Sequence, residues 1–267
     1  MMEITARVWE GTDYLPRVFD RWLADPGSTF EVAEEQGTVV AFHRLRPLSA
    51  GVVLYEGLRV AEEHRRRGVA RAMLRHGLEE AASQGFRELR VITGNPAACQ
   101  LFESEGFRRL VHCAVWLAGR VEGPDLPRLA SPEEVPGLLA RLREDPAWEV
   151  YGGVNADWEQ VAELDEQLLG QLAAEGRIRV GPGGRALALL VANPHNRLAV
   201  SLVAGSGAIL QDLLMGLRFE ADSQGYEGVR LFAPPRHPSG DDFAEVGYHL
   251  AHGQVQRYAY ARELDAL

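Results

Sequence analysis

The hydrophobic and polar positions change period along the chain, and each change marks an expected element. Residues 17–24 place Val18 and Trp22 four residues apart, which predicts a short helix that ends near "DPGS". A helical period also runs from Val69 to Ser83 and stops at Gly85. Between the two helices, segments that alternate or run apolar with β-branched residues predict three antiparallel strands, namely "TFEVAEE", "TVVAFHRL" and "GVVLYEGLRV".

The pattern continues as strand, helix and strand up to a break in the middle of the chain. The segments are "FRELRVIT", then "PAACQLFESEG" closed by Gly106, then "FRRLVHCAVWL". Residues 119–127, "GRVEGPDLP", hold two glycines and two prolines between apolar segments, which is typical of a linker. We therefore predict two domains, residues 1–120 and 121–267.

The second half repeats landmarks of the first. "SQGYEGVRLF" from Ser223 resembles "SQGFRELRVI" from Ser83 at an offset of 140 residues, and "FAEVGY" from Phe243 resembles "FESEGF" from Phe102 at an offset of 141. Strand-like "RALALLVA" and "RLAVSLVAG" precede a helical stretch from Ala208, in the order seen in the first half. These matches predict an internal duplication.

Composition and charge narrow the classes of function. The net charge of −10 argues against a nucleic-acid partner, which needs a basic surface. The two cysteines, Cys99 and Cys113, have no CxxC spacing or neighbouring histidines, so we expect no structural zinc and no disulfide. No apolar run is long enough to span a bilayer, and the first residues lack the pattern of a signal peptide, which predicts a cytoplasmic protein without membrane contact.

One basic run stands out in this acidic chain. Arg65, Arg66 and Arg67 directly precede Gly68 and the helix that begins at Val69. A helix N-terminus presents free N–H groups and favours an anion, glycine permits close approach, and arginine binds phosphate bidentately. The run therefore indicates a diphosphate site, although a solvated basic turn would look similar. Its counterpart 140 residues later is residues 205–208, "GSGA", which lacks the charge but whose glycines could still bind an anion.

Two stretches together carry a family resemblance. "RRRGVA" fits the Q/R-x-x-G-x-G/A signature of GNAT acyl-CoA N-acyltransferases, and "NPAACQLFESEGF" resembles the second characteristic stretch of that superfamily. The resemblance implies an α/β (α+β) fold of two tandem GNAT-like domains, the second degenerate. Each would be a mixed, mostly antiparallel sheet flanked by helices, and the sheet would be splayed open after its fourth strand.

The same resemblance implies acetyl-CoA as the co-substrate. Pantetheine would pair with the strand backbone, and the pyrophosphate would lie on the arginine run. The implied cofactor-binding residues are Leu58, Arg59, Val60, Arg65, Arg66, Arg67, Gly68, Val69, Ala70, Arg71, Asn95, Ala98 and Phe102. No metal is expected.

In this superfamily an amine attacks the thioester directly. Glu56 is our candidate base, because period two in its strand places it on the same face as Leu58 and Val60, although an exposed strand glutamate is the alternative. Phe102 stands where the pattern usually carries the tyrosine that protonates the leaving thiolate. That role is therefore vacant or taken by Tyr55, Ser104 or a water.

The substrate side resembles a narrower branch, the histidine N-acetyltransferase-like proteins. There the equivalent of "DYLP", residues 13–16, opens a helix beside the substrate cleft, which implies Asp13, Tyr14 and Glu56 as substrate-binding residues; Asp13 could instead simply cap the helix. A free amino acid suits the chemistry, because an α-amino group has a pKa of about 8 and needs only a weak base. Glu10, Asp13 or Glu56 could pair with the amine, and Arg44 or Arg46 with a carboxylate.

We thus predict an N-acetyltransferase whose first half binds acetyl-CoA and acetylates a primary amine of a small molecule, for which a free amino acid is one candidate. Alternatives are acetylation of a protein or xenobiotic amine, or an acyl-CoA-binding regulator without turnover. The chain is expected to be a monomer with pseudo-dimeric halves or a homodimer. His43, His64, His76 and His112 show no ligand spacing and are expected at the surface or in the core.

Overall fold

The chain folds into two compact units that interleave along the sequence. The computed structural model describes residue 4 and residues 15–158, 160–191, 196–253 and 256–264. Unit 1 comprises residues 1–92, 100–108 and 260–267, and unit 2 comprises residues 93–99 and 109–259. In the described part of the chain, no helix has both the length and the apolar character needed to cross a membrane.

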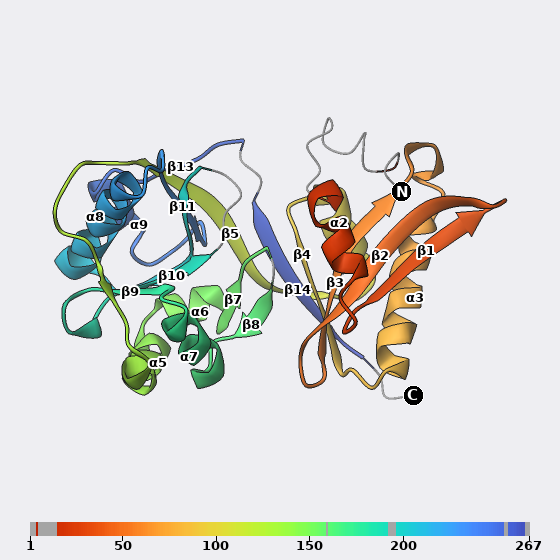
Figure 1. Cartoon of the computed structure of the whole chain (residues 1–267), viewed down its shortest axis with the longest axis horizontal. Coiled ribbons are helices and arrows are strands. Elements are labelled where there is room, and N and C mark those ends of the chain that lie inside the picture. The colour runs from red at the N-terminus through yellow and green to blue at the C-terminus, as the bar shows by residue number, and fades with distance from the viewer. Residues whose placement is uncertain (1–3, 5–14, 159, 192–195, 254–255, 265–267) are drawn as a thin grey trace. The chain divides into compact units, whose positions relative to one another are not determined.

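Unit 1 contains the helices and strands that the hydrophobic pattern predicts (Figure 1). Strands β1, β2 and β3 form an antiparallel ladder, and β3 pairs in parallel with β4. The order of neighbouring strands is β1-β2-β3-β4-β14. The elements are α2 (Leu15–Leu23), β1 (Thr29–Glu35), β2 (Thr38–Ser49), β3 (Val52–Val60), α3 (Val69–Ser83), β4 (Glu88–Thr93), α4 (Pro96–Ser104) and β14 (Arg257–Glu263), with a 3₁₀ turn at Glu62–His64. Helix α4 and strand β14 cross the boundary between the units, because residues 96–99 and 257–259 belong to unit 2.

Helices α2 and α3 cover opposite faces of the β1–β3 ladder. On one face, Leu15 and Trp22 of α2 pack against Phe42 of β2. On the other, Met73 of α3 packs against Ala41 and Val60. Because successive strand residues point to opposite faces, Ala41 lies on the α3 side of the sheet and Phe42 lies on the α2 side.

Unit 2 repeats the strand and helix order of unit 1 and adds a helical segment that the sequence pattern did not indicate. Its strand order is β14-β5-β12-β11-β10-β9-β6, and β7 and β8 form a separate hairpin. The elements are β5 (Arg108–Gly119), β6 (Arg128–Leu129), α5 (Val135–Glu144), α6 (Ala147–Tyr151), β7 (Val154–Ala156), β8 (Val161–Glu163), α7 (Glu166–Ala174), β9 (Ile178–Val180), β10 (Leu187–Val191), β11 (Leu198–Ala204), α8 (Gly207–Ser223), β12 (Gly228–Ala233), α9 (Gly240–Glu245) and β13 (His249–Leu250), with 3₁₀ turns at Pro132–Glu134 and Pro182–Gly184.

The duplicated segments exchange their final strands. Strand β5 follows α4 in sequence, yet its residues from Arg109 onward belong to unit 2, where they pair with β12. Conversely, the C-terminal residues from Tyr260 onward belong to unit 1. The mixed α/β architecture predicted from the sequence is confirmed, whereas the division into residues 1–120 and 121–267 stays a prediction about the duplicated segments.

Candidate active site

The segment between β3 and α3, residues 61–68, forms a loop whose backbone is shaped to bind an anion; we refer to it as the arginine loop. Arg66 and Gly68 both have positive φ, 60° and 85°. Gly68 also stands at the N-cap of α3 without any side-chain cap. Within the described residues, no acceptor contacts the backbone N–H groups of Arg66 to Ala70. Free N–H groups beside left-handed residues at a helix N-terminus make an anion-binding concavity.

The arginines of the loop fall into two groups. Arg65 Nε donates to the Val60 carbonyl at 3.2 Å, which ties the loop to the end of β3. Arg66 and Arg67 are exposed, and their guanidinium groups have no partner among the residues that the structure describes. The left-handed φ of Arg66 is an uncommon, strained conformation for a residue with a side chain, and such strain is concentrated at functional sites.

Arg71, on the first turn of α3, is held by a residue that the sequence analysis did not single out. Its Nη1 donates to Glu105 Oε1 at 2.6 Å and its Nη2 to Ser104 Oγ at 3.2 Å. Arg75 Nε donates to Glu105 Oε2 at 2.9 Å. Hydrogen bonding from Arg75, joined by the charges of Arg75, Arg71 and Arg262, lowers the pKa of Glu105. Glu105 is therefore a charged anchor that orients Arg71 next to the arginine loop.

Replacing Glu105 with glutamine is expected to weaken acetyl-CoA binding about threefold. The change keeps the shape of the side chain but removes the charge that makes its hydrogen bonds to arginine strong, so Arg71 loses its fixed orientation. Isothermal titration of acetyl-CoA measures the effect. Glu79→Gln, an exposed change on α3, the helix that carries Arg71, is the control, and equal affinities for the two variants would contradict the assigned role.

The far end of β3 is open on its β4 side. The parallel ladder runs from Val52–Glu88 to Tyr55–Val91, whereas β3 continues to Val60. Beyond Tyr55, no described strand pairs with this edge of β3. Leu58, Arg59 and Val60, the residues predicted to meet pantetheine, lie in the part of β3 that extends beyond the ladder with β4. The resemblance implied an opening after the fourth strand of the domain, and β3 is the third strand among the described residues.

A β-bulge at Gly57 corrects one expectation. Opposite β2, Glu56 pairs with Arg44 and Arg59 with Phe42, so the register shifts between these pairs. Gly57 has φ 71°. Leu58 and Val60 consequently pack on the α3 side with Met73, whereas Glu56 lies on the α2 side. The prediction that Glu56 shares a face with Leu58 and Val60 is wrong, because a bulge breaks the alternation of period two.

Gly57→Ala is expected to destabilise the protein by about 2–3 kcal/mol, from the left-handed backbone and from overpacking. A Cβ at this position would lie 2.6 Å from the ring of the buried Trp22. Urea unfolding measures the loss. Gly37→Ala is the matched control, because Gly37 has φ 78° but open space around the added Cβ; it should cost only about 1 kcal/mol. Equal losses would contradict the Trp22 contact.

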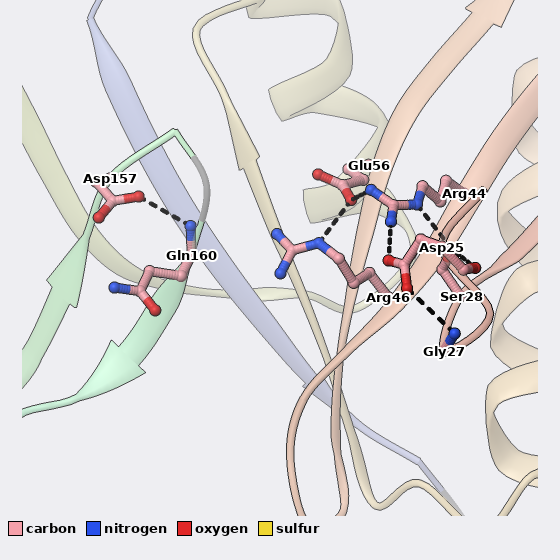
Figure 2. Close-up of polar contacts among 8 residues, drawn as sticks. All are labelled: Asp25, Gly27, Ser28, Arg44, Arg46, Glu56, Asp157 and Gln160. Carbon is pink, nitrogen blue, oxygen red and sulfur yellow. Dashed lines mark hydrogen bonds and ion pairs between the residues drawn. The ribbon is translucent and has the colours of Figure 1, made fainter. Parts of the chain in front are cut away.

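On the α2 side, Glu56 belongs to a charged cluster (Figure 2). Its Oε1 accepts hydrogen bonds from Arg44 Nη1 at 2.9 Å and from Arg46 Nε at 3.0 Å. Arg44 is buried, with its guanidinium 4.8 Å from the Trp22 ring centroid, and it also bonds Asp25 and Ser28 Oγ, the latter at 3.0 Å. Burial lowers the pKa of Arg44, an effect opposed by the charges of Glu56 and Asp25.

This cluster leaves part of the carboxylate available. Within the described residues, Glu56 Oε2 has no hydrogen-bond partner. The Arg46 side chain is 25% exposed, against 4% for Arg44, so Arg46 is the arginine that an incoming ligand could reach. The arrangement can bind a cation at Glu56 beside an anion at Arg46. Asp25 and Ser28 were not predicted as members, and Asp13, Tyr14 and Glu10 lie outside the described residues.

The second stretch of the family resemblance, "NPAACQLFESEGF", mainly makes contacts within the protein. Asn95 Oδ1 accepts a hydrogen bond from Ala97 N at 2.9 Å at the start of α4. Ala98 is half-buried on the same helix. Phe102 is buried, with its ring centroid 5.3 Å from that of Phe107 and 6.2 Å from that of Tyr260. The position of the usual tyrosine is therefore filled by an aromatic cluster.

Two residues considered as the general acid, Tyr55 and Ser104, are poorly placed for that role. Tyr55 is buried beneath α3, 4.7 Å from the His43 ring, and burial raises its pKa well above the usual range. Tyr55 faces α3, while Glu56 lies on the opposite side. Ser104 Oγ donates to the Leu101 carbonyl at 2.8 Å and accepts from Arg71.

The four histidines considered in the sequence analysis contact carboxylate or amide side chains. His43 is buried and His76 exposed, and both contact the Glu31 carboxylate, while His64 contacts Glu35. His112 contacts Gln256. Both cysteines are free. Among the residues that the structure describes, no group of histidine, cysteine and acidic side chains could hold a metal ion.

The equivalent region of unit 2 is already filled by the protein's own carboxylates. Only residues 205–206 connect β11 to α8, so the arginine loop has no counterpart of similar length. Asp145 Oδ2 accepts from Gly205 N at 2.8 Å, and Asp242 Oδ2 accepts from Gly207 N at 3.0 Å. The sequence left open an anion cradle at "GSGA"; in the structure these two amides bind aspartates.

Comparisons with known proteins identify a family that the N-terminal part of the chain matches. Residues 1–107 match the family model described as the acetyltransferase (GNAT) family. A histidine N-acetyltransferase of Scomber australasicus is 35% identical over 92 residues, which cover 34% of this chain and 27% of that protein. N-acetyltransferase family 8 member 3 of Rattus norvegicus is 34% identical over 102 residues, covering 36% and 43%. The chain thus spans less than half the length of these relatives.

Solved structures match over nearly the whole chain. A GCN5-related N-acetyltransferase from Sphaerobacter thermophilus has a TM-score of 0.61 at 13% identity, covering 98% of this chain and 90% of that chain. A tandem GNAT protein from the clavulanic acid biosynthesis pathway has a TM-score of 0.54 at 16% identity, covering 99% and 93%. At these identities, the likeness concerns the fold.

Proposed function

Because the N-terminal part of this chain, residues 1–107, is an acetyltransferase domain of the GNAT family, we propose that the protein transfers the acetyl group of acetyl-CoA to a primary amine of a small molecule. The arginine loop carries this proposal. Within the described residues, its N–H groups and the guanidinium groups of Arg66 and Arg67 have no partner, which suits a pyrophosphate, and the end of β3 beyond the ladder with β4 suits an extended pantetheine.

The acceptor we favour is a free amino acid. Glu56 Oε2 would bind the ammonium group and accept its proton, and Arg46 would meet the carboxylate. The two groups are already held next to each other by the hydrogen bond from Arg46 Nε to Glu56 Oε1. An α-amino group, with a pKa of about 8, requires little basicity from its partner. The name of one relative, histidine N-acetyltransferase, supports this class of acceptor.

In the proposed reaction the neutral amine attacks the thioester carbon. The C–N bond forms, the C–S bond breaks, and the amine nitrogen loses a proton as the amide forms. The thiolate leaves and takes a proton from water, because Ser104 is engaged and Tyr55 faces α3. A thiolate is a modest base, so protonation by water is adequate without a dedicated acid.

A second candidate is an acyl-CoA-binding regulator without turnover. The observation that favours it is Phe102, packed in the aromatic cluster where a hydroxyl would otherwise stand. Acetylation of a protein or xenobiotic amine remains an alternative within the enzymes. Such an amine would bring no carboxylate to the site, so Arg46 beside Glu56 would have no substrate group to bind.

Measurement of CoA release with a panel of acceptors separates these functions. We expect turnover with a subset of free L-amino acids and a strong loss with their amides, which lack the carboxylate. Equal rates with acids and amides would contradict the role of Arg46. Tight acetyl-CoA binding without release of CoA for any amine would exclude the enzyme and support the regulator.

A further inference from the structure

Unit 2 holds a fully buried arginine whose hydrogen-bonding capacity is only partly used. Arg257, on β14, is 0% exposed. Its Nη1 donates to the Ala156 carbonyl of β7. Its Nε and Nη2 are buried and have no hydrogen-bond partner within the described residues. A buried cation with unpaired donors is costly, so such a group is expected to have a partner when the protein functions.

The unused edge of Arg257 is the one that binds carboxylates bidentately. The same unit provides the comparison: Arg179 Nε donates to Glu220 Oε2 at 2.8 Å, and Arg179 Nη2 donates to Glu220 Oε1 at 2.6 Å. Among the described residues, no acid pairs with the corresponding Nε and Nη2 donors of Arg257. A planar two-oxygen acceptor fits this pair of parallel N–H groups better than a single water.

The surroundings of Arg257 combine aromatic faces with a second unpaired polar group. The guanidinium carbon lies 3.5 Å from the Phe232 ring centroid and 5.1 Å from the Trp158 ring centroid. Trp158 is 42% exposed, so it marks the solvent side of the cluster. Asn155 precedes Ala156 on β7; it is 0% exposed, and both its amide oxygen and its amide nitrogen lack a partner among the described residues.

The charges of the groups around Arg257 are compatible with binding an anion. Burial lowers the pKa of Arg257 to about 10, which still leaves the group charged at neutral pH. Burial raises the pKa of the nearby Cys113 thiol to about 12, so that thiol is neutral. Asp157 is the nearby acid, and its Oδ1 accepts from Gln160 N at 2.9 Å (Figure 2), while Arg230 adds a second positive charge.

We propose that Arg257 and Asn155 form a binding site in unit 2 for a small carboxylate, with the carboxylate oxygens on Arg257 Nε and Nη2 and the ligand body against Trp158. All of these residues belong to unit 2, whereas the arginine loop belongs to unit 1. The proposed carboxylate ligand is bound by residues of unit 2, whereas the CoA pyrophosphate is assigned to the arginine loop of unit 1. It supplies a recognition function for a half of the chain that lacks the arginine loop.

Sodium benzoate is the probe, and benzamide, which has the same shape without the charge, is its control. Isothermal titration of the full-length protein should give a saturable benzoate isotherm with a Kd below about 1 mM and no isotherm with benzamide. Arg257→Lys keeps the charge but loses the bidentate edge, and should weaken benzoate binding at least about tenfold. The exposed Arg236→Lys, in the same unit, should leave binding unchanged.

A second readout locates the ligand without altering Arg257. Benzoate should change tryptophan emission of the wild-type protein, and Trp158→Phe should remove most of that change while keeping the affinity within about threefold. Absence of benzoate and acetate binding to the wild-type protein, in a sample that binds acetyl-CoA, would overturn the proposal. So would benzoate binding that is equal in wild type and Arg257→Lys, or an emission change that persists in Trp158→Phe.

Discussion

The double variant Arg67→Ala, Gly68→Asp loses acetyl-CoA binding by at least about 100-fold, since it removes a charge-assisted contact and adds a repelling charge. Gly68 caps α3 with φ 85°, and a Cβ added there meets no atom within 4 Å. Aspartate is among the residues that tolerate this backbone region. The variant therefore keeps its fold, but places a carboxylate where the phosphates would bind. Isothermal titration of acetyl-CoA, with circular dichroism as the folding control, measures the effect.

The matched control is Ala208→Asp in unit 2. Ala208 is exposed on the first turn of α8, at the position that corresponds to Gly68 by the repeat offset. An acidic residue in the first turn of a helix is favourable, so this variant should fold normally. The amides of Gly205 and Gly207 already bind Asp145 and Asp242, so acetyl-CoA affinity should stay within about twofold of wild type. A large loss would mean that unit 2 also binds the cofactor.

The second large effect is expected for Glu56→Gln, which should lower kcat/KM for the best amino acid about 100-fold. Glutamine can keep the hydrogen bonds from Arg44 and Arg46 to Oε1, but it cannot accept the proton of the substrate ammonium. If Glu56 acts as the base, kcat falls and activity recovers as the pH rises through the pKa of the amine. Steady-state rates from pH 6 to 10 test this, with Glu31→Gln as a control in the same ladder but on the α3 side.

A different pattern would assign Glu56 a positioning role. If it only orients Arg46, Glu56→Gln should raise KM for amino acids and leave kcat and its pH profile unchanged. The rates with amine substrates that lack a carboxylate should then be the same for Glu56→Gln and wild type. That outcome would contradict proton transfer to Glu56 while leaving the acetyl-CoA site intact, because the arginine loop is a separate segment of unit 1.

The pH profile of stability offers no substitute for these tests, because buried histidines that do not contact Glu56 contribute to it. Burial lowers the pKa of His237 to about 4. The unfolded chain therefore binds its proton near pH 6.5 while the folded chain does not, and stability is lost as the pH falls from about 6.5 towards 4. Burial also lowers the pKa of His43, which belongs to unit 1, so this loss reports on buried histidines of both units and not on Glu56.

Local features of the site could be predicted from the sequence by itself. Helix α3, the hairpins of β1–β3 and the arginine loop depend on neighbouring residues: apolar period, turn-forming glycine and the free N–H groups of a helix start. These are properties of short segments, and Val69–Ser83 is the helix that was predicted. The duplication was likewise visible, since matched sequence landmarks fall on β12 and α9.

Only the tertiary structure decided what surrounds those features. The bulge at Gly57, which moves Glu56 to the α2 side, depends on the register between β2 and β3. The contact of Arg71 with Glu105 joins residues 34 positions apart, and Asp145 and Asp242 reach α8 from other segments of unit 2. The lack of a partner for Arg257 Nε and Nη2 within the described residues is visible only once the neighbours of Arg257 in space are known. Charge pairing and burial are set by distance in space, which a one-dimensional pattern does not specify.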